Sequence, residues 1–237
     1  MSRKMTTMLR KRISLDSSLV YRRYDDACGT AHSLELIGDR WALLIMRELM
    51  LGGRRFSQLR ADLPGVSANI LTQRLAELEG RGILTRKRLP PPASVQVYEL
   101  TPWGYEAENI VKEMGRWAAR SVHHDPTLRI SAVSVLLSLR TMHSRERAKG
   151  IDTVVGFRFG EEVYRGHLTE AGIAITRGDA SDANVAFDGE PTALAAAVHG
   201  GVPFAQLESA GALHVTGDRK LAKKFVKLFP LPTKASD

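Results

Sequence analysis

Apolar residues recur with helical spacing in the segment that follows residue 28, and glycines punctuate it. A first short helix is expected over residues 31–37, closed by Gly38. Asp39 is a plausible N-cap for the next helix, because Trp41, Leu44, Ile45 and Leu49 follow at helical spacing and form one stripe. The stripe predicts a helix with one buried face that ends at the next pair of glycines.

The next two helices are separated by a tight turn. Residues 56–63 read as a short helix, Pro64-Gly65 as a turn, and Ser67 as the N-cap of a longer helix that ends at Gly80. Three leucines of the longer helix share one face, namely Leu71, Leu75 and Leu78. The pattern predicts a helix-turn-helix.

The period then changes from helix to strand. Residues 83–88 and 95–100 alternate as two strands around a proline-rich loop. Two strands directly behind a helix-turn-helix form a wing. Thr101-Pro102 is an N-cap with proline at the first helical position, and it begins a long last helix. That helix carries an apolar stripe, expected to contact a second subunit, made of Ala107, Ile110, Val111, Met114, Trp117 and Ala118.

A break near residues 123–126 marks the expected domain boundary, and beyond it one helix is followed by strands and further helices. The fold class is therefore α+β. The predicted organisation is a basic arm over 1–20, a winged-helix domain over 21–124 and a second domain of mixed sheet and helices over 127–232.

The charge belongs to the first half of the 237-residue chain. The net charge is +8. Residues 1–120 hold 20 basic and 13 acidic side chains, against 14 and 13 in the remainder. A basic half that contains a helix-turn-helix is typical of nucleic-acid binding.

The second helix of such a motif enters the major groove of DNA, and its N-terminal and outward residues reach base edges. The residues expected there are Ser67, Ala68, Asn69, Thr72, Gln73 and Arg74. Phosphate contacts are expected from basic residues on the neighbouring helix and on the wing, namely Arg54, Arg55, Arg60, Arg86, Lys87 and Arg88. Each of these residue types is also common on solvent-exposed surfaces that bind no DNA, so the prediction rests on their arrangement.

Residues 28 to about 120 resemble the HxlR family of bacterial winged-helix transcription regulators. The resemblance is carried by Cys28, Leu36–Trp41, Ile45–Leu49, Arg55–Leu59, Leu71–Leu75, Leu78 and Tyr98–Gly104. It implies a homodimer joined through the first and last helices of the domain, with paired recognition helices on a palindromic operator in double-stranded DNA.

Some members of that family sense oxidants or electrophiles with a cysteine at the position of Cys28, which is the only cysteine in the chain. The family usually has proline after it, whereas this chain has Gly29. Two interpretations stay open: a redox sensor, or a small apolar residue at the dimer interface, and the sequence favours the second.

The stretch from Gly211 to Asp218, before a last amphipathic helix, is similar to the C-terminal half of sterol-carrier-type lipid-binding domains. This looser resemblance spans about residues 130–230 and implies a site for a small apolar ligand. The residues expected to line it are Phe187, Leu194, Val198, Phe204, Leu207, Leu213 and Phe225. A plain packed core explains the same apolar positions equally well.

The sequence offers no catalytic or cofactor-binding motif, so no enzyme activity, cofactor or metal site is expected. It has no apolar stretch suited to span a bilayer, and a single cysteine fits a bacterial cytoplasm, with the protein at the nucleoid when it acts. The prediction is a dimeric DNA-binding regulator whose C-terminal domain either binds an apolar or amphipathic ligand that alters the arrangement of the recognition helices or only adds dimer contacts. The alternative is a lipid-binding or carrier protein that uses its winged helix only for dimerisation or docking.

Overall fold

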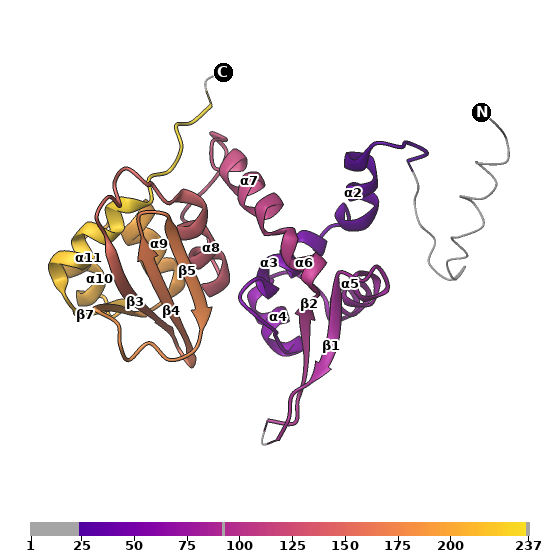
Figure 1. Ribbon diagram of the computed structural model, residues 1–237, viewed down its shortest axis with the longest axis horizontal. Helices are drawn as coiled ribbons and strands as arrows, with labels where there is room; N and C mark the ends of the chain where they lie inside the picture. The colour runs from indigo at the N-terminus through magenta and orange to yellow at the C-terminus, as the bar shows by residue number, and fades with distance from the viewer. Residues whose placement is uncertain (1–23, 92, 236–237) are drawn as a thin grey trace.

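The computed structural model describes residues 24–91 and 93–235 (Figure 1). The basic arm expected over residues 1–20 lies outside them. The described chain has an N-terminal winged helix and a C-terminal five-stranded sheet covered by helices, as predicted for an α+β protein.

The winged helix follows the predicted order of helices and strands. Its elements are α2 (Gly29–Ile37), α3 (Ala42–Leu49), α4 (Phe56–Asp62), α5 (Ala68–Gly80), β1 (Leu84–Arg88), β2 (Gln96–Leu100), α6 (Pro102–Glu106) and α7 (Glu108–Ala118). Strands β1 and β2 pair antiparallel and form the wing. Arg54 adds a short bridge to this hairpin by exchanging both backbone hydrogen bonds with Tyr98.

Helix α3 begins later than expected, and its buried face differs from the predicted stripe. Its N-cap is Trp41, at φ 80°, and not Asp39. The prediction that Leu44 is buried is wrong, since Leu44 is 39% exposed, whereas Ala42 and Met46 join the core.

The predicted long last helix is divided into α6 and α7 at Ala107. Thr101 caps α6 as expected, because its hydroxyl accepts from the backbone N–H of Gly104 at 3.1 Å. Gly104 is required here, since a Cβ would lie 2.1 Å from the carbonyl oxygen of Ile83. The apolar stripe of α7 contacts solvent, and Trp117 is 76% exposed.

The C-terminal half is built around the sheet β5-β4-β3-β6-β7, in which β3 and β6 are parallel and the other neighbours antiparallel. Its elements are α8 (Ala132–Met142), β3 (Asp152–Phe159), β4 (Glu162–Thr169), β5 (Gly172–Arg177), β6 (Val185–Gly189), α9 (Pro191–His199), α10 (Phe204–Ser209), β7 (Leu213–Gly217), α11 (Arg219–Phe225) and the 3₁₀-helix η1 (Val226–Leu228).

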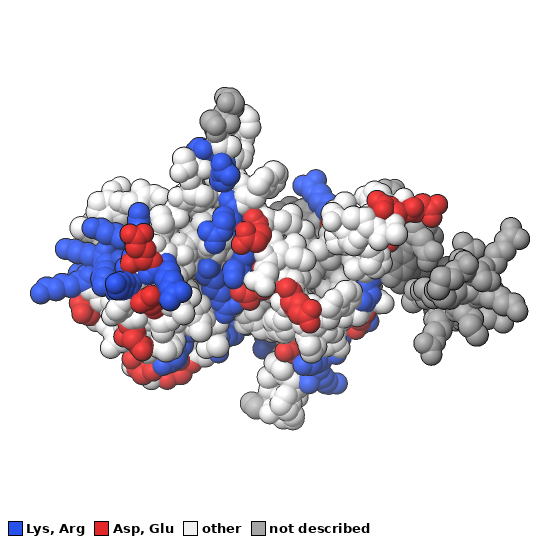
Figure 2. All heavy atoms as spheres, turned by 45° about the horizontal axis from the view of Figure 1, so that its top comes forward, with Lys and Arg blue, Asp and Glu red and all other residues white. Residues whose placement is uncertain are grey.

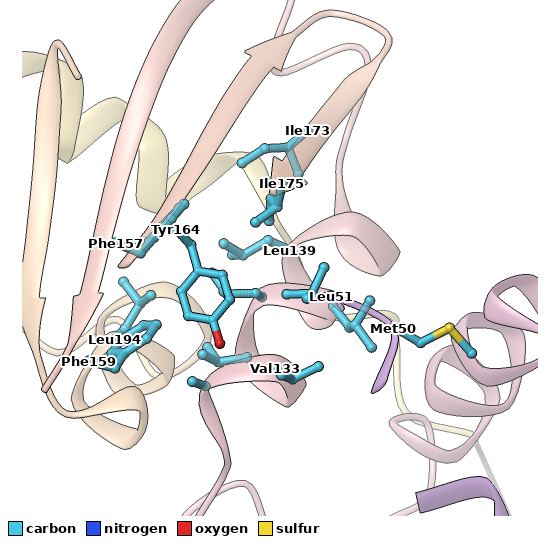
Figure 3. Packing of buried hydrophobic residues seen from close by; sticks show 14 of the residues in the cluster. Met50, Leu51, Val133, Leu139, Phe157, Phe159, Tyr164, Ile173, Ile175 and Leu194 are labelled. Atoms are coloured by element: carbon cyan, nitrogen blue, oxygen red, sulfur yellow. The ribbon is translucent and has the colours of Figure 1, made fainter. Parts of the chain in front are cut away.

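The two halves share one hydrophobic core. In Figure 3, Leu51 follows α3 and lies beside Val133 and Leu139 of α8, with Tyr164 of β4 close by. Since all four residues are buried and belong to one cluster, the winged helix and the sheet are packed together.

The C-terminal tail returns to the winged helix. The backbone N–H of Ala235 donates to the carbonyl oxygen of Arg120 at 2.8 Å, and Arg120 Nε donates to the carbonyl oxygen of Thr233 at 3.2 Å. Lys234 Nζ donates to the carbonyl oxygens of Ala119 and Ser121 at 3.1 and 2.9 Å. The tail therefore caps the end of α7.

Candidate DNA-binding interface

The turn before α5 fixes how this helix meets the surface. Gly65 has φ 89°, a conformation that glycine adopts at little cost and that ends the preceding turn. Ser67 then caps α5, because its hydroxyl accepts from the backbone N–H of Ile70 at 3.3 Å. Leu71, Leu75 and Leu78 face the core, so the opposite face of α5 is presented to solvent.

The exposed face of α5 carries four of the six residues predicted to read bases: Ser67, Asn69, Thr72 and Gln73. Ala68 is half-buried beside them. Gln73 Nε2 donates to Glu77 Oε1 at 2.9 Å. Hydroxyl and amide groups on one exposed helix face can donate to and accept from base edges in a major groove.

Arg74 is turned away from this face. Its side chain is only 16% exposed, and it is paired with Glu77 and, at 3.4 Å, with Asp39. Arg74 Nε also donates to the carbonyl oxygen of Arg40 at 3.3 Å. These contacts hold α5 against the turn that precedes α3.

The wing presents three exposed cations around a hollow of about 410 Å³, namely Arg86, Lys87 and Arg88. Arg86 is paired with Glu79 of α5, which lowers the pKa of that carboxyl through a hydrogen bond. Lys87 is paired with Glu99 at 2.7 Å. Among the described residues no carboxylate pairs with Arg88, so this guanidinium is available to a phosphate.

The prediction that Arg54 points outward to a phosphate is wrong. Arg54 is 2% exposed and is paired with Asp62 of α4 and Glu162 of β4. Burial alone would lower its pKa, but these two carboxylates raise it, so the guanidinium stays charged. Arg55 and Arg60, in contrast, are exposed as predicted.

A second buried polar contact joins the two halves. The hydroxyl of Ser131, the N-cap of α8, donates to Glu48 Oε1 at 2.8 Å, and Arg47 donates to the same oxygen. Glu48 is fully buried, and this burial raises its pKa. The pairing of Glu48 with Ser131 could not be predicted from the sequence, since nothing local marks residues 83 positions apart as neighbours.

Cys28 is the N-cap residue of α2 and is exposed. The backbone N–H groups of Ala31 and Thr30, together with the Thr30 hydroxyl, lower the pKa of the thiol. A thiol at a helix N-terminus ionises more readily because backbone donors stabilise the thiolate.

The seven residues expected to line a ligand cavity fall into two groups. Phe187, Leu194, Leu207, Leu213 and Phe225 are buried in the core, and the ring centroids of Phe187 and Phe225 are 5.1 Å apart. These five do not line the groove that lies between the end of α9, the start of α10 and α11, which is called the C-terminal groove. Val198 and Phe204 do line it, and the groove has a volume of about 860 Å³.

The described residues hold no cluster of three His, Cys, Asp or Glu side chains arranged for a metal ion. Within residues 24–91 and 93–235, the helices are too short or too polar to cross a bilayer.

The N-terminal half of the chain is similar to known regulators. Residues 36–126 match the family described as HxlR-like helix-turn-helix. The uncharacterized HTH-type transcriptional regulator YvaP of Bacillus subtilis is 34% identical over 95 residues, which are 40% of this chain and 86% of that protein. The HTH-type transcriptional regulator YodB of the same organism is 36% identical over 86 residues, which are 36% of this chain and 77% of that protein.

Among solved structures, the redox regulator HypR in its reduced form is similar, at 30% identity and a TM-score of 0.36, over 38% of this chain and 90% of that chain. The family and these relatives are transcriptional regulators and not enzymes, and the carrier-protein alternative finds no support among them. The chain belongs to the HxlR-like helix-turn-helix family of DNA-binding transcriptional regulators.

Proposed function

We propose that this regulator reads operator DNA with the exposed face of α5, while the wing holds the phosphate backbone. The observation that carries the proposal is the position of Asn69, Thr72 and Gln73 on one exposed face of α5, a helix that is joined to the wing by the ion pair of Glu79 with Arg86. Amide side chains suit adenine edges, and Arg86, Lys87 and Arg88 would fix the register on the duplex.

Arg55 and Arg60 would add phosphate contacts from α4, whereas Arg54 would not, because its charge is already paired inside the protein. Arg74 would contribute to DNA binding indirectly, since its contacts with Asp39 and Arg40 hold α5 in place. The proposed interface therefore has amide and hydroxyl groups at its centre and cations at its edges.

The proposed homodimer joins through α2 and α7. Both helices expose apolar side chains, which are Leu34 on α2 and Ile110, Met114 and Trp117 on α7. An exposed apolar stripe of this size is typical of an interface between subunits. Two recognition helices related by a twofold axis would read a palindromic operator, and this activity would take place in the cytoplasm, at the nucleoid.

DNA binding tests the α5 assignment directly. Fluorescence anisotropy with the DNA upstream of the protein's own gene, compared with a scrambled duplex, gives the discrimination between sequences. Asn69→Ala and Gln73→Ala should each reduce that discrimination roughly 5- to 150-fold, the effect of about 1–3 kcal/mol per lost base contact.

Gln206→Ala is the matched control, because Gln206 is an exposed amide on α10 in the other half of the chain. It should leave the discrimination unchanged. If the α5 variants behave like Gln206→Ala, then this face does not read bases.

A second candidate function is thiol sensing, which the exposure and lowered pKa of Cys28 favour. Alkylation of Cys28 at the start of α2 would place a bulky group beside the proposed dimer interface and so alter operator affinity. Treatment with a quinone should change the affinity of the wild type and leave Cys28→Ala unaffected. An equal change in both proteins would exclude this function.

Ligand control is the last element of the proposal. The shared core and the buried contacts between the two halves support coupling between ligand binding and DNA binding. A ligand that shifts the C-terminal helices would also displace the residues of the winged helix that pack against them. The 860 Å³ groove is the candidate site in place of the predicted cavity lined by core phenylalanines.

A further inference from the structure

The C-terminal groove has an apolar floor. It lies where α9 ends and α10 begins, beside α11 and the start of the tail. Its large apolar lining residues, which together are called the floor, are Val198, Phe204, Val226, Phe229 and Leu231. A volume of about 860 Å³ falls within the range of small-molecule sites.

The rim of the groove is basic. Arg219, Lys223 and Lys227 follow one another at four-residue spacing, which puts them on one side of α11 and η1. Arg147 comes from the loop after α8, and its Nη1 donates to the carbonyl oxygen of Lys227 at 2.9 Å. Four cations therefore border the apolar surface.

Three of these cations lack an acidic partner among the described residues. Arg219 is paired with Glu208 at 2.7 Å. For Arg147, Lys223 and Lys227, the described part of the chain supplies no carboxylate within ion-pair distance. The described residues that line the groove include no Asp or Glu.

Burial lowers the pKa of His199 in the groove wall, so this ring adds no charge at neutral pH. The groove thus has, beside its apolar floor, three positive charges that no described carboxylate neutralises.

The positive charge is concentrated at this end of the molecule. Figure 2 shows Lys and Arg side chains gathered where α11 lies in Figure 1. Lys220 and Lys224 belong to the same helix but do not line the groove. The C-terminal half is nearly neutral as a whole, so the gathering reflects placement and not composition.

We propose that the groove binds a single-chain amphiphile with an anionic head, a proposal that rests on the ligand control proposed above. The alkyl chain would cover the floor at Val198, Phe204 and Val226, where burial of apolar surface supplies the affinity. The head would lie between Lys223, Lys227 and Arg147, whose mutual repulsion an anion relieves.

The apolar floor and the basic rim together argue against ligands that match only one of them. A free phosphate or a DNA backbone would leave the apolar floor in water, and a neutral hydrocarbon would leave the three cations uncompensated. A ligand with both properties matches both surfaces. The chemical class of the ligand therefore follows from an apolar floor that lies next to a basic rim.

Calorimetric titration of the full chain, without DNA, tests the ligand class. The probes are dodecanoate, dodecan-1-ol and acetate, each below the concentration at which it aggregates. Dodecanoate should bind at least about tenfold more tightly than dodecan-1-ol, because only it engages the cations. Acetate should show no binding at the same concentrations, since it lacks the chain.

A pair of charge-reversal variants tests the location. Lys223→Glu with Lys227→Glu reverses two rim charges, whereas Lys220→Glu with Lys224→Glu makes the same change in net charge on the neighbouring positions of α11, outside the groove. All four lysines are exposed, so both proteins should fold. The first should lose at least about tenfold in dodecanoate affinity, and the second should stay within about twofold.

Equal losses in the two variants would overturn the proposal, because they would indicate a response to net charge alone. Equal affinity for dodecanoate and dodecan-1-ol would overturn it as well, since the head would then play no part. The titration contains no DNA, so a failure of operator binding and a failure of this site are observed separately.

Discussion

Arg54 of the winged helix and Glu162 of β4 form an ion pair across the two halves of the chain, although 108 positions separate them. Asp62 of α4 completes the arrangement on the other side of the guanidinium. The contact fixes the segment before α4 to the C-terminal sheet. Ligand control would therefore act through a rigid contact and not through a flexible linker.

Removal of the Arg54 side chain should destabilise the whole protein. Arg54→Met removes the cation shared by Asp62 and Glu162 and leaves Glu162 with only the more distant Arg177, at 3.9 Å, and breaking a buried pair costs about 3–5 kcal/mol. We expect the lower end of that range, because both carboxylates retain some solvent contact. Urea denaturation measures the free energy of unfolding, with Arg55→Met as the exposed control. Similar values for the two variants would contradict the assignment.

Glu48 should make stability fall as the pH rises. Its pKa is raised above the ordinary value of 4.5 in the folded protein, so the folded state holds its proton more tightly than the unfolded state. Above pH 4.5, the wild type loses this advantage progressively until the raised pKa is passed. Glu48→Gln does not titrate, so its stability relative to the wild type should increase across that window.

Urea denaturation at a series of pH values measures this difference, with the exposed Glu146→Gln as control. The difference between Glu48→Gln and the wild type should depend on pH, and the difference for Glu146→Gln should not. A flat difference for Glu48→Gln would mean that the carboxyl titrates alike in both states.

Arg88 should act on DNA without regard to sequence. It is exposed and unpaired among the described residues of the wing, so Arg88→Ala should weaken binding to specific and scrambled duplexes by the same factor. The slope of log affinity against log salt should fall by about 1 in magnitude. Arg145→Ala, an exposed arginine of the C-terminal half, should leave the slope unchanged. Loss of affinity for only one duplex would instead assign Arg88 to base reading.

Trp117 should be required for the dimer. Trp117→Asp puts a charge on the exposed stripe of α7, where burial against a second subunit would be unfavourable. Light scattering after gel filtration should then report a monomer. Leu128→Asp changes an equally apolar exposed residue outside α2 and α7 and should leave the dimer intact. A dimeric Trp117→Asp would remove α7 from the interface.

The thiol of Cys28 should ionise at lower pH in the folded protein than in the unfolded chain. The backbone N–H groups near residue 30 stabilise the thiolate only when α2 is formed. Because the chain has one cysteine, the difference in thiolate absorbance between the wild type and Cys28→Ala reports this group alone. Titration with and without guanidinium gives the two midpoints, and coincident midpoints would contradict the helix effect.

Local pattern was sufficient for the helix-turn-helix and the wing. Ser67, the leucines of α5 and the strand alternation are signals within a few residues of the structure they form. The cap at Thr101 is of the same kind. Such features could be predicted because neighbouring residues determine them.

Contacts between distant residues could not be predicted in this way. Arg54 looks like any basic residue before a helix, and only Glu162, far along the chain, makes it a buried ion pair. Phe187 and Phe225 have the periodicity of a cavity wall and of a packed core alike, and they contact each other. The groove needed α9, α11 and the tail in place before floor and rim became one surface.

Because the tail caps α7, residues 234 and 235 are suitable positions for a label that reports on the second subunit. Lys234 and Ala235 are held beside residues 119–121, at the end of the helix proposed to meet the second subunit. A fluorophore attached at residue 235 would thus be anchored near that subunit. Energy transfer between two labelled chains would measure the separation of the subunits as DNA or an amphiphile is added, without any change to the residues that bind either one.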